Sequence, residues 1–107
     1  MVPDIVIAQT TIDDEAQAEE LARGAVERRL AACAHIDAPL TAVYRWKNDL
    51  VQDKEWRISY KTTRERLPAL AEWVGEAHAY EVPEWIVIAV DGGSEAYLSW
   101  VAEESTP

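Results

Sequence analysis

The sequence contains a single cysteine, Cys33, among 107 residues, so no disulfide can form within the chain. A lone free thiol is typical of proteins in a reducing compartment. No apolar run approaches the roughly 18 residues needed to cross a bilayer, and the amino terminus lacks the basic and apolar segments of a secretory signal. From these absences we expect a cytoplasmic protein without a membrane partner.

Positive charge is also scarce, with 10 Lys and Arg residues against 20 Asp and Glu residues and a formal net charge of -10. A chain of this charge repels polyanions at long range unless a local basic patch intervenes. The basic residues are scattered along the sequence and form no such patch. We therefore expect no nucleic-acid partner.

Recognisable catalytic motifs are missing as well. Nothing in the sequence resembles a Ser, His and acid constellation, a phosphate-binding glycine loop or a paired carboxylate motif. Gly92 and Gly93 form an ordinary turn signal. The sequence therefore indicates a protein that is not an enzyme.

What the chain does contain is a hydrophobic fraction of 49% beside 28% charged residues, a balance typical of a soluble globular protein. Its 107 residues suit one domain, residues 1–107, and are too few for two. The five tryptophans exceed what a monomer of this size usually needs, which favours sheets and interfaces as their locations.

Apolar periodicity and turn residues predict an alternation of strands and helices. The first half is expected to contain a strand over Asp4–Ala8, a helix that begins among Asp13, Asp14 and Glu15, and strands over Ala31–Ile36 and Thr41–Trp46. After a turn at Lys47–Asp49 we expect a strand in which Trp56, Ile58 and Tyr60 alternate with Glu55, Arg57, Ser59 and Lys61. The remaining elements are a helix entered at Leu67, a strand over Trp85–Val90, and a short helix with Tyr97, Trp100 and Val101 on one face. The tail after Glu103 is expected to be loose. This order is the split βαβ or ferredoxin-like arrangement of an α+β protein, with a C-terminal helix added.

Both longer helices are expected to bury one apolar stripe. The stripes are Ala18, Leu21, Ala22, Ala25, Val26 and Leu30 in the first helix, and Leu70, Ala71, Val74, Ala77 and His78 in the second. Gly24 lowers the stability of the first helix but permits close packing, and Pro68 fits only within the first turn of the second helix.

The hairpin between the two helices is longer than the first strand needs as a partner. Part of it should therefore project beyond the protomer's own sheet and expose strand edges. Because another subunit could cover these edges, we expect an oligomer.

Several short motifs are distributed along essentially the whole chain: Leu30, Ala31, Ala32, Cys33 and Ala34; Tyr44 and Trp46; Lys61 and Thr62; His78, Tyr80, Glu81 and Pro83; and Tyr97, Leu98 and Trp100. In spacing and order they resemble the motifs of the CutA divalent-cation-tolerance family. The resemblance implies a ferredoxin-like protomer, a tight homotrimer joined by sheet edges, and tolerance to or binding of divalent metals, chiefly copper.

Cys33 and His35 are candidate metal ligands because they lie two residues apart on a predicted strand. Their side chains should share a face at about 6.5 to 7 Å, a spacing that a Cu or Zn ion could bridge. Copper prefers sulfur and imidazole ligands. The alternative interpretation is that Cys33 is a small buried apolar residue and His35 a partly exposed strand residue.

His78 is a candidate metal ligand through the family resemblance. At the end of a helix, an imidazolium could instead interact with the terminal carbonyls. Copper-binding bacterial members of the family can supply a cysteine at the end of the first strand and a second histidine beside the one that matches His78. Those positions hold Gln9 and Ala77 here, so we expect Cu(II) to bind weakly.

Lys61, Tyr80 and Glu81 are expected from the family pattern to lie near clefts between subunits, where they fix the trimer or bind a ligand. The leading hypothesis is a homotrimeric, non-enzymatic protein that binds divalent metal. The alternatives are a signalling trimer that holds a small ligand in its clefts, like the similarly built nitrogen-regulatory PII proteins, and a stable scaffold for partner proteins of unknown identity.

Overall fold

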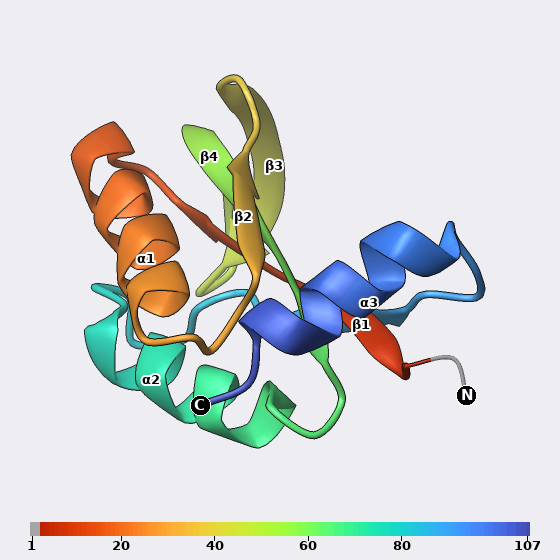
Figure 1. Ribbon diagram of the computed structural model, residues 1–107. Coiled ribbons are helices and arrows are strands. Elements are labelled where there is room, and N and C mark those ends of the chain that lie inside the picture. Colours follow the sequence, from red (N-terminus) through yellow and green to blue (C-terminus); the bar gives the residue numbers. More distant parts are fainter. Residues whose placement is uncertain (1–2) are drawn as a thin grey trace.

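The computed structural model describes residues 3–107 and contains, over that range, a five-stranded antiparallel sheet and three helices (Figure 1). The elements are β1 (Ile5–Ile12), α1 (Glu15–Glu27), β2 (Cys33–Ile36), β3 (Leu40–Trp46), β4 (Asp49–Thr63), α2 (Leu67–Ala77), β5 (Ile86–Ala89) and α3 (Glu95–Glu104). The strand order β2-β4-β1-β5, with β3 paired to the outer part of β4, confirms the predicted α+β arrangement. No helix among residues 3–107 is long and apolar enough to cross a membrane.

Helices α1 and α2 cover one face of the sheet, and α3 lies on the other face (Figure 1). The main core lies under α1 and α2 and joins Leu21 and Leu70 to the strand residues Ala8, Ile58 and Tyr60. Tyr60 is fully buried, and its hydroxyl donates a hydrogen bond to the carbonyl of Leu21 at 2.9 Å. A buried phenol needs such an acceptor, so this bond ties α1 to the centre of the sheet.

The close approach of α1 to α2 depends on Gly24. A Cβ atom at this position would lie 2.6 Å from the ring of Trp73, which α2 presses against α1. The glycine therefore exchanges some helix stability for contact between the two helices, as the sequence predicts. Pro68 lies in the first turn of α2, also as predicted.

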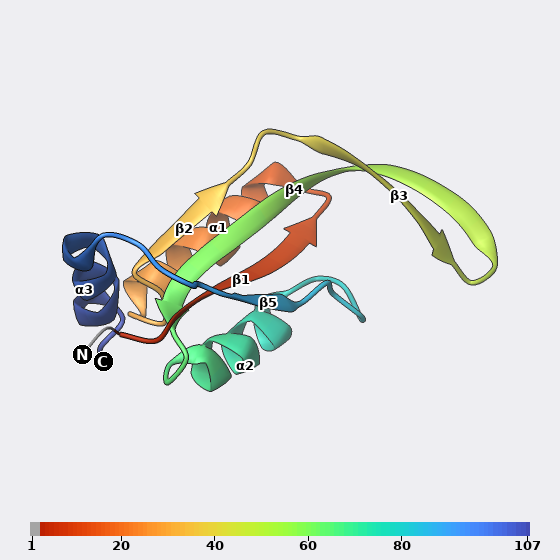
Figure 2. The same cartoon turned by 90° about the vertical axis from the view of Figure 1, so that its right-hand side faces the viewer.

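The hairpin of β3 and β4 projects from the body of the protein (Figure 2) and gives it a longest dimension of 48 Å. Its turn residues Lys47 and Asn48 have φ angles of 49° and 70°. Two successive left-handed residues produce a turn whose twist matches that of the flanking strands. The hairpin exposes Val43 and Leu50, with 58% and 72% of their surface accessible. The predicted projection is confirmed.

The predicted end of the first strand was wrong. β1 continues past Ala8 to Ile12, and its residues Thr10 and Thr11 pair with Ile58 and Arg57 of β4. Threonine is β-branched and favours extended structure, so its hydroxyl does not end the strand when a partner strand continues beside it.

The predicted loose tail was also wrong. Ser105 is fully buried, and its hydroxyl donates to the carbonyl of Val101 at 2.7 Å. The guanidinium of Arg29, which follows α1, donates to the carbonyls of Glu103 and Thr106. The contacts of Arg29 are long-range and tie the C-terminal residues to the end of α1, and no local pattern in the tail itself encodes them.

Three helix faces differ from prediction in detail. Val26 and Ala77 are exposed because each lies in the last turn of its helix, where the helix leaves the sheet. In α3, Leu98 and Val101 are buried, whereas Tyr97 and Trp100 are exposed and pack on each other with ring centroids 5.6 Å apart.

Candidate functional site

The face of the sheet away from α1 and α2 carries the first candidate site. Ala34 and Ile36 of β2 pack against the main core, so the alternating residues Cys33 and His35 point to the opposite face. Lys61 of β4 pairs with Cys33 across the strands, and its Nζ lies 3.0 Å from Nδ1 of His35. We call Cys33, His35 and Lys61 the sheet-face cluster. The structure thus brings together two of the three predicted metal ligands.

Cys33 is a half-buried free thiol beside α3. Burial raises the pKa of Tyr97, and the neighbouring Cys33 adds to this rise. The phenol therefore stays protonated and provides a polar neighbour for the thiol. A half-buried thiol, an exposed imidazole and an ammonium on one face of the sheet form a polar patch, and among residues 3–107 no third His, Cys, Asp or Glu side chain joins the thiol and the imidazole.

His78, the third predicted ligand, lies elsewhere and is used differently. It caps the C-terminal end of α2 and is 7% exposed. Its Nδ1 accepts a hydrogen bond from the backbone N–H of Tyr80 at 3.0 Å, so Nε2 carries the proton that is donated to the carbonyl of Thr11 at 2.9 Å. Both ring nitrogens are engaged, and they attach the segment after α2 to the end of β1.

Within residues 3–107, no group of three or more His, Cys, Asp or Glu side chains is placed to hold a metal ion. The sheet-face cluster offers two ligands of suitable chemistry, and His78 is not near enough to complete them. Any metal site with a full ligand set in this chain therefore needs groups from outside the protomer.

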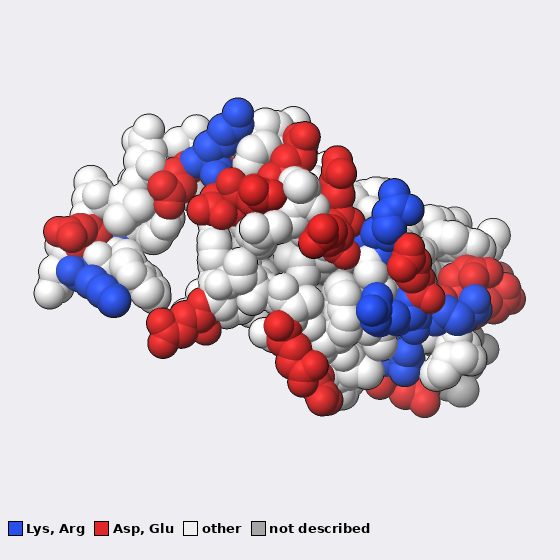
Figure 3. All heavy atoms as spheres, turned by 90° about the vertical axis from the view of Figure 1, so that its left-hand side faces the viewer, with Lys and Arg blue, Asp and Glu red and all other residues white. Residues whose placement is uncertain are grey.

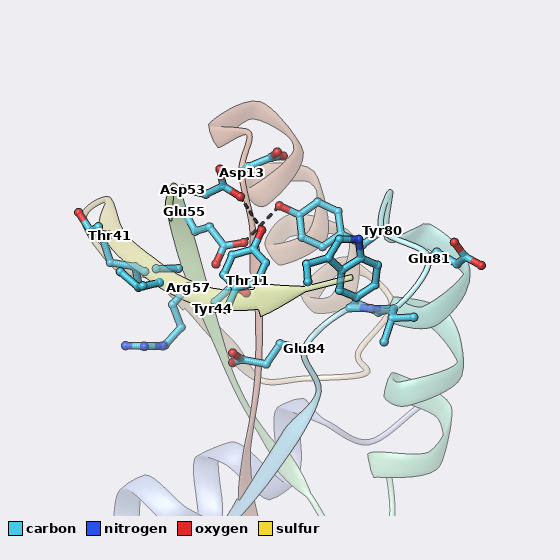
Figure 4. Close-up of a pocket in the computed structure, with 16 residues that line it drawn as sticks. Thr11, Asp13, Thr41, Tyr44, Asp53, Glu55, Arg57, Tyr80, Glu81 and Glu84 are labelled. Carbon is cyan, nitrogen blue, oxygen red and sulfur yellow. Dashed lines mark hydrogen bonds between the residues drawn. The ribbon is translucent and has the colours of Figure 1, made fainter. Parts of the chain in front are cut away.

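A second candidate site lies at the other end of β4. A cavity of about 740 Å³ opens between the β3–β4 hairpin, the end of β1 and the segment 80–84 (Figure 4). We call it the hairpin cavity. Its lining includes the side chains of five carboxylic acids, one arginine and three aromatic residues: Asp13, Asp53, Glu55, Glu81, Glu84, Arg57, Tyr44, Trp46 and Tyr80. The space-filling view shows an opening beside the projecting hairpin with acidic side chains on its rim (Figure 3).

Two phenol and carboxylate pairs organise the hairpin cavity. The hydroxyl of Tyr80 donates to Oε2 of Glu55 at 3.2 Å, and the hydroxyl of Tyr44 donates to Oδ2 of Asp53 at 2.5 Å. Figure 4 shows these groups gathered with Asp13 at one side of the cavity, whereas Glu81 points away from them. The pairs hold two carboxylates of β4 in fixed positions, one through a phenol of β3 and the other through a phenol of the segment after α2.

The surroundings of the cavity raise the pKa values of its two tyrosine hydroxyls. The hydrogen bond to Asp53 raises the pKa of Tyr44 to about 12. Burial raises the pKa of Tyr80 well above its ordinary value, and the charges of Asp13 and Glu55 raise it further. Both phenols therefore remain neutral donors at physiological pH, and the charge of the cavity comes from its carboxylic acids and Arg57.

Glu55 is the residue that sequence reasoning missed most clearly. The period of two in β4 places it on the polar side of the strand, yet it is only 6% exposed because segment 80–84 and the hairpin close over it. Asp13 and Asp53 were likewise not predicted as site residues. Tyr80 was, and it lies in this cavity about 20 Å along β4 from Lys61. The position of Lys61, Tyr80 and Glu81 near clefts between subunits stays a prediction.

Comparison with known proteins identifies the fold and its family together. Residues 6–104 match the family described as CutA1 divalent ion tolerance protein. The chain belongs to the CutA1 family. This confirms the resemblance read from its motifs, and the CutA1 family name connects the chain to tolerance of divalent ions.

CutA proteins from distant organisms are similar to this chain. It is 38% identical to the CutA homolog of Xenopus laevis over 96 residues, which are 90% of this chain and 64% of the Xenopus protein, so the chain spans less than two thirds of that relative. It is 39% identical over 95 residues to the divalent-cation tolerance protein CutA of Thermus thermophilus, which covers 89% of this chain and 92% of that protein. The structure of CutA from Synechococcus elongatus complexed with a Bis-Tris molecule matches with a TM-score of 0.87 and 38% identity, over 97% of this chain and 95% of that one.

Proposed function

We propose that this CutA1-family chain acts as a homotrimer that binds copper or another divalent cation weakly and catalyses no reaction. The observation that carries the proposal is the sheet-face cluster, which places a thiol and an imidazole together on an open face. These are the ligand types that copper prefers, and the family is named for tolerance to divalent ions.

Exposed strand edges support the trimer. β5 is an edge strand whose residues Ile86, Val87 and Ile88 are all exposed. An apolar edge with unpaired backbone groups is a site for pairing with another chain. In a closed ring of three copies, each protomer would cover such an edge on its neighbour and leave none open.

Trimer formation also supplies what the metal hypothesis lacks. Cys33 and His35 provide two ligands from one protomer, and neighbouring copies would add the equivalent residues if the sheet-face cluster lies at the trimer axis or an interface. His78 stays a candidate ligand, but it takes part only if one of its two hydrogen bonds is released. We therefore place the metal at Cys33 and His35.

Calorimetric titration with Cu(II) and Zn(II), together with a solution mass measurement, tests this proposal. We expect a mass of three chains and Cu(II) affinity that falls at least about tenfold in both Cys33→Ser and His35→Ala. Ser59→Ala, on the same face beside His35, is the matched control and should leave the affinity unchanged. A monomeric mass, or equal affinity in all three variants, would contradict the proposal.

The second candidate function is binding of a small ligand, as in a PII-like signalling trimer. The hairpin cavity favours it, because about 740 Å³ lies within the usual range of small-molecule sites and the enclosed carboxylate of Glu55 offers a polar anchor. The similar CutA of Synechococcus elongatus is described in complex with a Bis-Tris molecule, which supports the capacity of this fold to hold an organic molecule.

A further inference from the structure

We propose that the hairpin cavity binds a small organic cation with two ammonium groups, one held by the Tyr80 and Glu55 pair and the other by the Tyr44 and Asp53 pair. The inference rests on the second candidate function, that the cavity takes a small ligand, and it assigns the chemistry of that ligand.

The strongest indication is the carboxylate of Glu55. It is 6% exposed, and a buried carboxylate is costly unless a positive charge or several hydrogen bonds compensate it. Over residues 3–107 the ion pairs are Arg29 with Glu104, Arg57 with Asp37 and Arg64 with Asp4, and none of them includes Glu55. Tyr80 donates one hydrogen bond to Oε2, while a carboxylate accepts about four. Glu55 therefore has unused acceptor capacity and no counter-charge.

The spacing of the two carboxylates sets the length of the ligand. Asp53 and Glu55 are two residues apart on β4, so their side chains leave the same face of the strand from Cα positions about 6.5 to 7 Å apart. A short alkyl diamine such as 1,4-diaminobutane spans this distance in an extended form. The two phenols fix both carboxylates in advance, which reduces the entropy lost on binding.

The charge and shape of the cavity select against other ligands. With five carboxylic acids and one arginine in the lining, a phosphate or nucleotide would be repelled. A bare metal ion needs several ligands at about 2 Å, and no group of three acidic, histidine or cysteine side chains among residues 3–107 converges in this way. An organic dication suits two carboxylates that share a strand face, and the rings of Tyr44 and Tyr80 in the lining are aromatic groups suited to cation–π attraction for its ammonium groups.

The test is calorimetric titration of the full chain in amine-free phosphate buffer with 1,4-diaminobutane, 1-aminobutane and 1,4-butanediol. These three probes have the same carbon chain and carry two, one and no ammonium groups. We expect the diamine to bind at least about tenfold more tightly than the monoamine, and no measurable heat from the diol. Equal binding of the three probes, or no diamine binding at millimolar concentration, overturns the proposal.

Variants locate the site. Glu55→Gln keeps the shape and an acceptor for Tyr80 but removes the charge, so it should weaken diamine binding at least about tenfold. Glu65→Gln changes an exposed glutamate outside the cavity and should have no effect. Asp53→Asn, at a half-buried position, provides a second site variant should Glu55→Gln fold poorly, and it should bring diamine affinity close to that of the monoamine. Unchanged affinity in a folded Glu55→Gln or Asp53→Asn variant would place the ligand elsewhere.

Two further readouts separate the hypotheses. If the diamine does not bind and Glu55→Gln changes the solution mass of the protein, a neighbouring subunit fills the cavity and the proposal is wrong. Cu(II) titration of the same samples should give an affinity that the diamine leaves unchanged, because the sheet-face cluster lies about 20 Å along β4 from Glu55. If the diamine does not bind but Cu(II) does, the proposal of a dication in the hairpin cavity is overturned, and the proposal of metal binding at the sheet-face cluster is not.

Discussion

The two polar regions of this protein lie on the same side of one strand and differ in almost every physical respect. At one end of β4, Lys61 contacts His35 beside Cys33 on an open sheet face. At the other end, Glu55 and Asp53 line a cavity in which tyrosine hydroxyls hold both carboxylates. The first region has suitable ligand atoms but too few of them, whereas the second has a formed cavity that lacks a compensating charge. The difference indicates that a full metal site at the sheet-face cluster would need ligands from outside the protomer, while the hairpin cavity is organised within one protomer.

The largest expected effect is a difference in the free energy of unfolding between variants of the two histidines. His78→Ala removes two buried hydrogen bonds and leaves the carbonyl of Thr11 and the N–H of Tyr80 without a partner. We expect the free energy of unfolding to fall by about 2–4 kcal/mol. His35→Ala, at an exposed position of the sheet-face cluster, should change it by less than about 0.5 kcal/mol. Urea denaturation at fixed protein concentration measures both, and equal losses would remove the structural distinction between them.

A smaller change in the free energy of unfolding is expected when either of two tyrosine hydroxyls is removed. Tyr80→Phe removes the donor to the enclosed carboxylate of Glu55, and we expect a loss of about 1–2 kcal/mol in unfolding free energy. Tyr97→Phe removes an exposed hydroxyl beside Cys33 and should have little effect on stability. If thermal or urea denaturation ranks the two variants in the reverse order, the cavity is not the more constrained of the two regions.

A pH titration examines the cavity without changing its stability at neutral pH. The pKa of Tyr44 is raised from 10.0 to about 12 because its hydroxyl donates to Asp53. A folded-state pKa above the unfolded value means that the stabilisation is fully present below pH 10 and is lost as the pH rises through about 12. Ultraviolet absorbance of tyrosinate should show all four tyrosines titrating above pH 10, because the pKa of each is raised, and Asp53→Asn should return one of them toward pH 10. A titration curve that is the same in Asp53→Asn as in the unchanged protein would contradict the effect of Asp53 on Tyr44.

The smallest expected effect concerns Lys61. Lys61→Gln should change the free energy of unfolding by less than about 0.5 kcal/mol, because its contact with His35 lies at the surface. It should nevertheless raise Cu(II) affinity by about fivefold, since it removes a positive charge near the proposed ligands. Titration of Lys61→Gln beside Lys61→Arg, which retains the charge, measures this. Equal copper affinity in the two variants would move the metal away from the sheet-face cluster.

The fold and the shared strand face of Cys33 and His35 could be predicted from the sequence, whereas the hairpin cavity could not. Apolar periodicity and turn residues predicted the order of the elements, the position of Pro68 in α2 and the projecting hairpin, because each of these depends on neighbours within a few residues. The alternation of β2 predicted that Cys33 and His35 share a face for the same reason. The contact with Lys61 depends on the register between β2 and β4, which no local pattern contains.

The hairpin cavity shows what only the tertiary structure decided. The alternation in β4 determined by itself that Asp53 and Glu55 point to one side of the strand. That this side is enclosed at Glu55 depends on the segment after α2 returning across the sheet, where His78 attaches it to Thr11 and Tyr80 meets the carboxylate. Burial is a property of elements that come together from distant parts of the chain, so a residue that is polar by its sequence pattern became the enclosed anionic centre of a cavity.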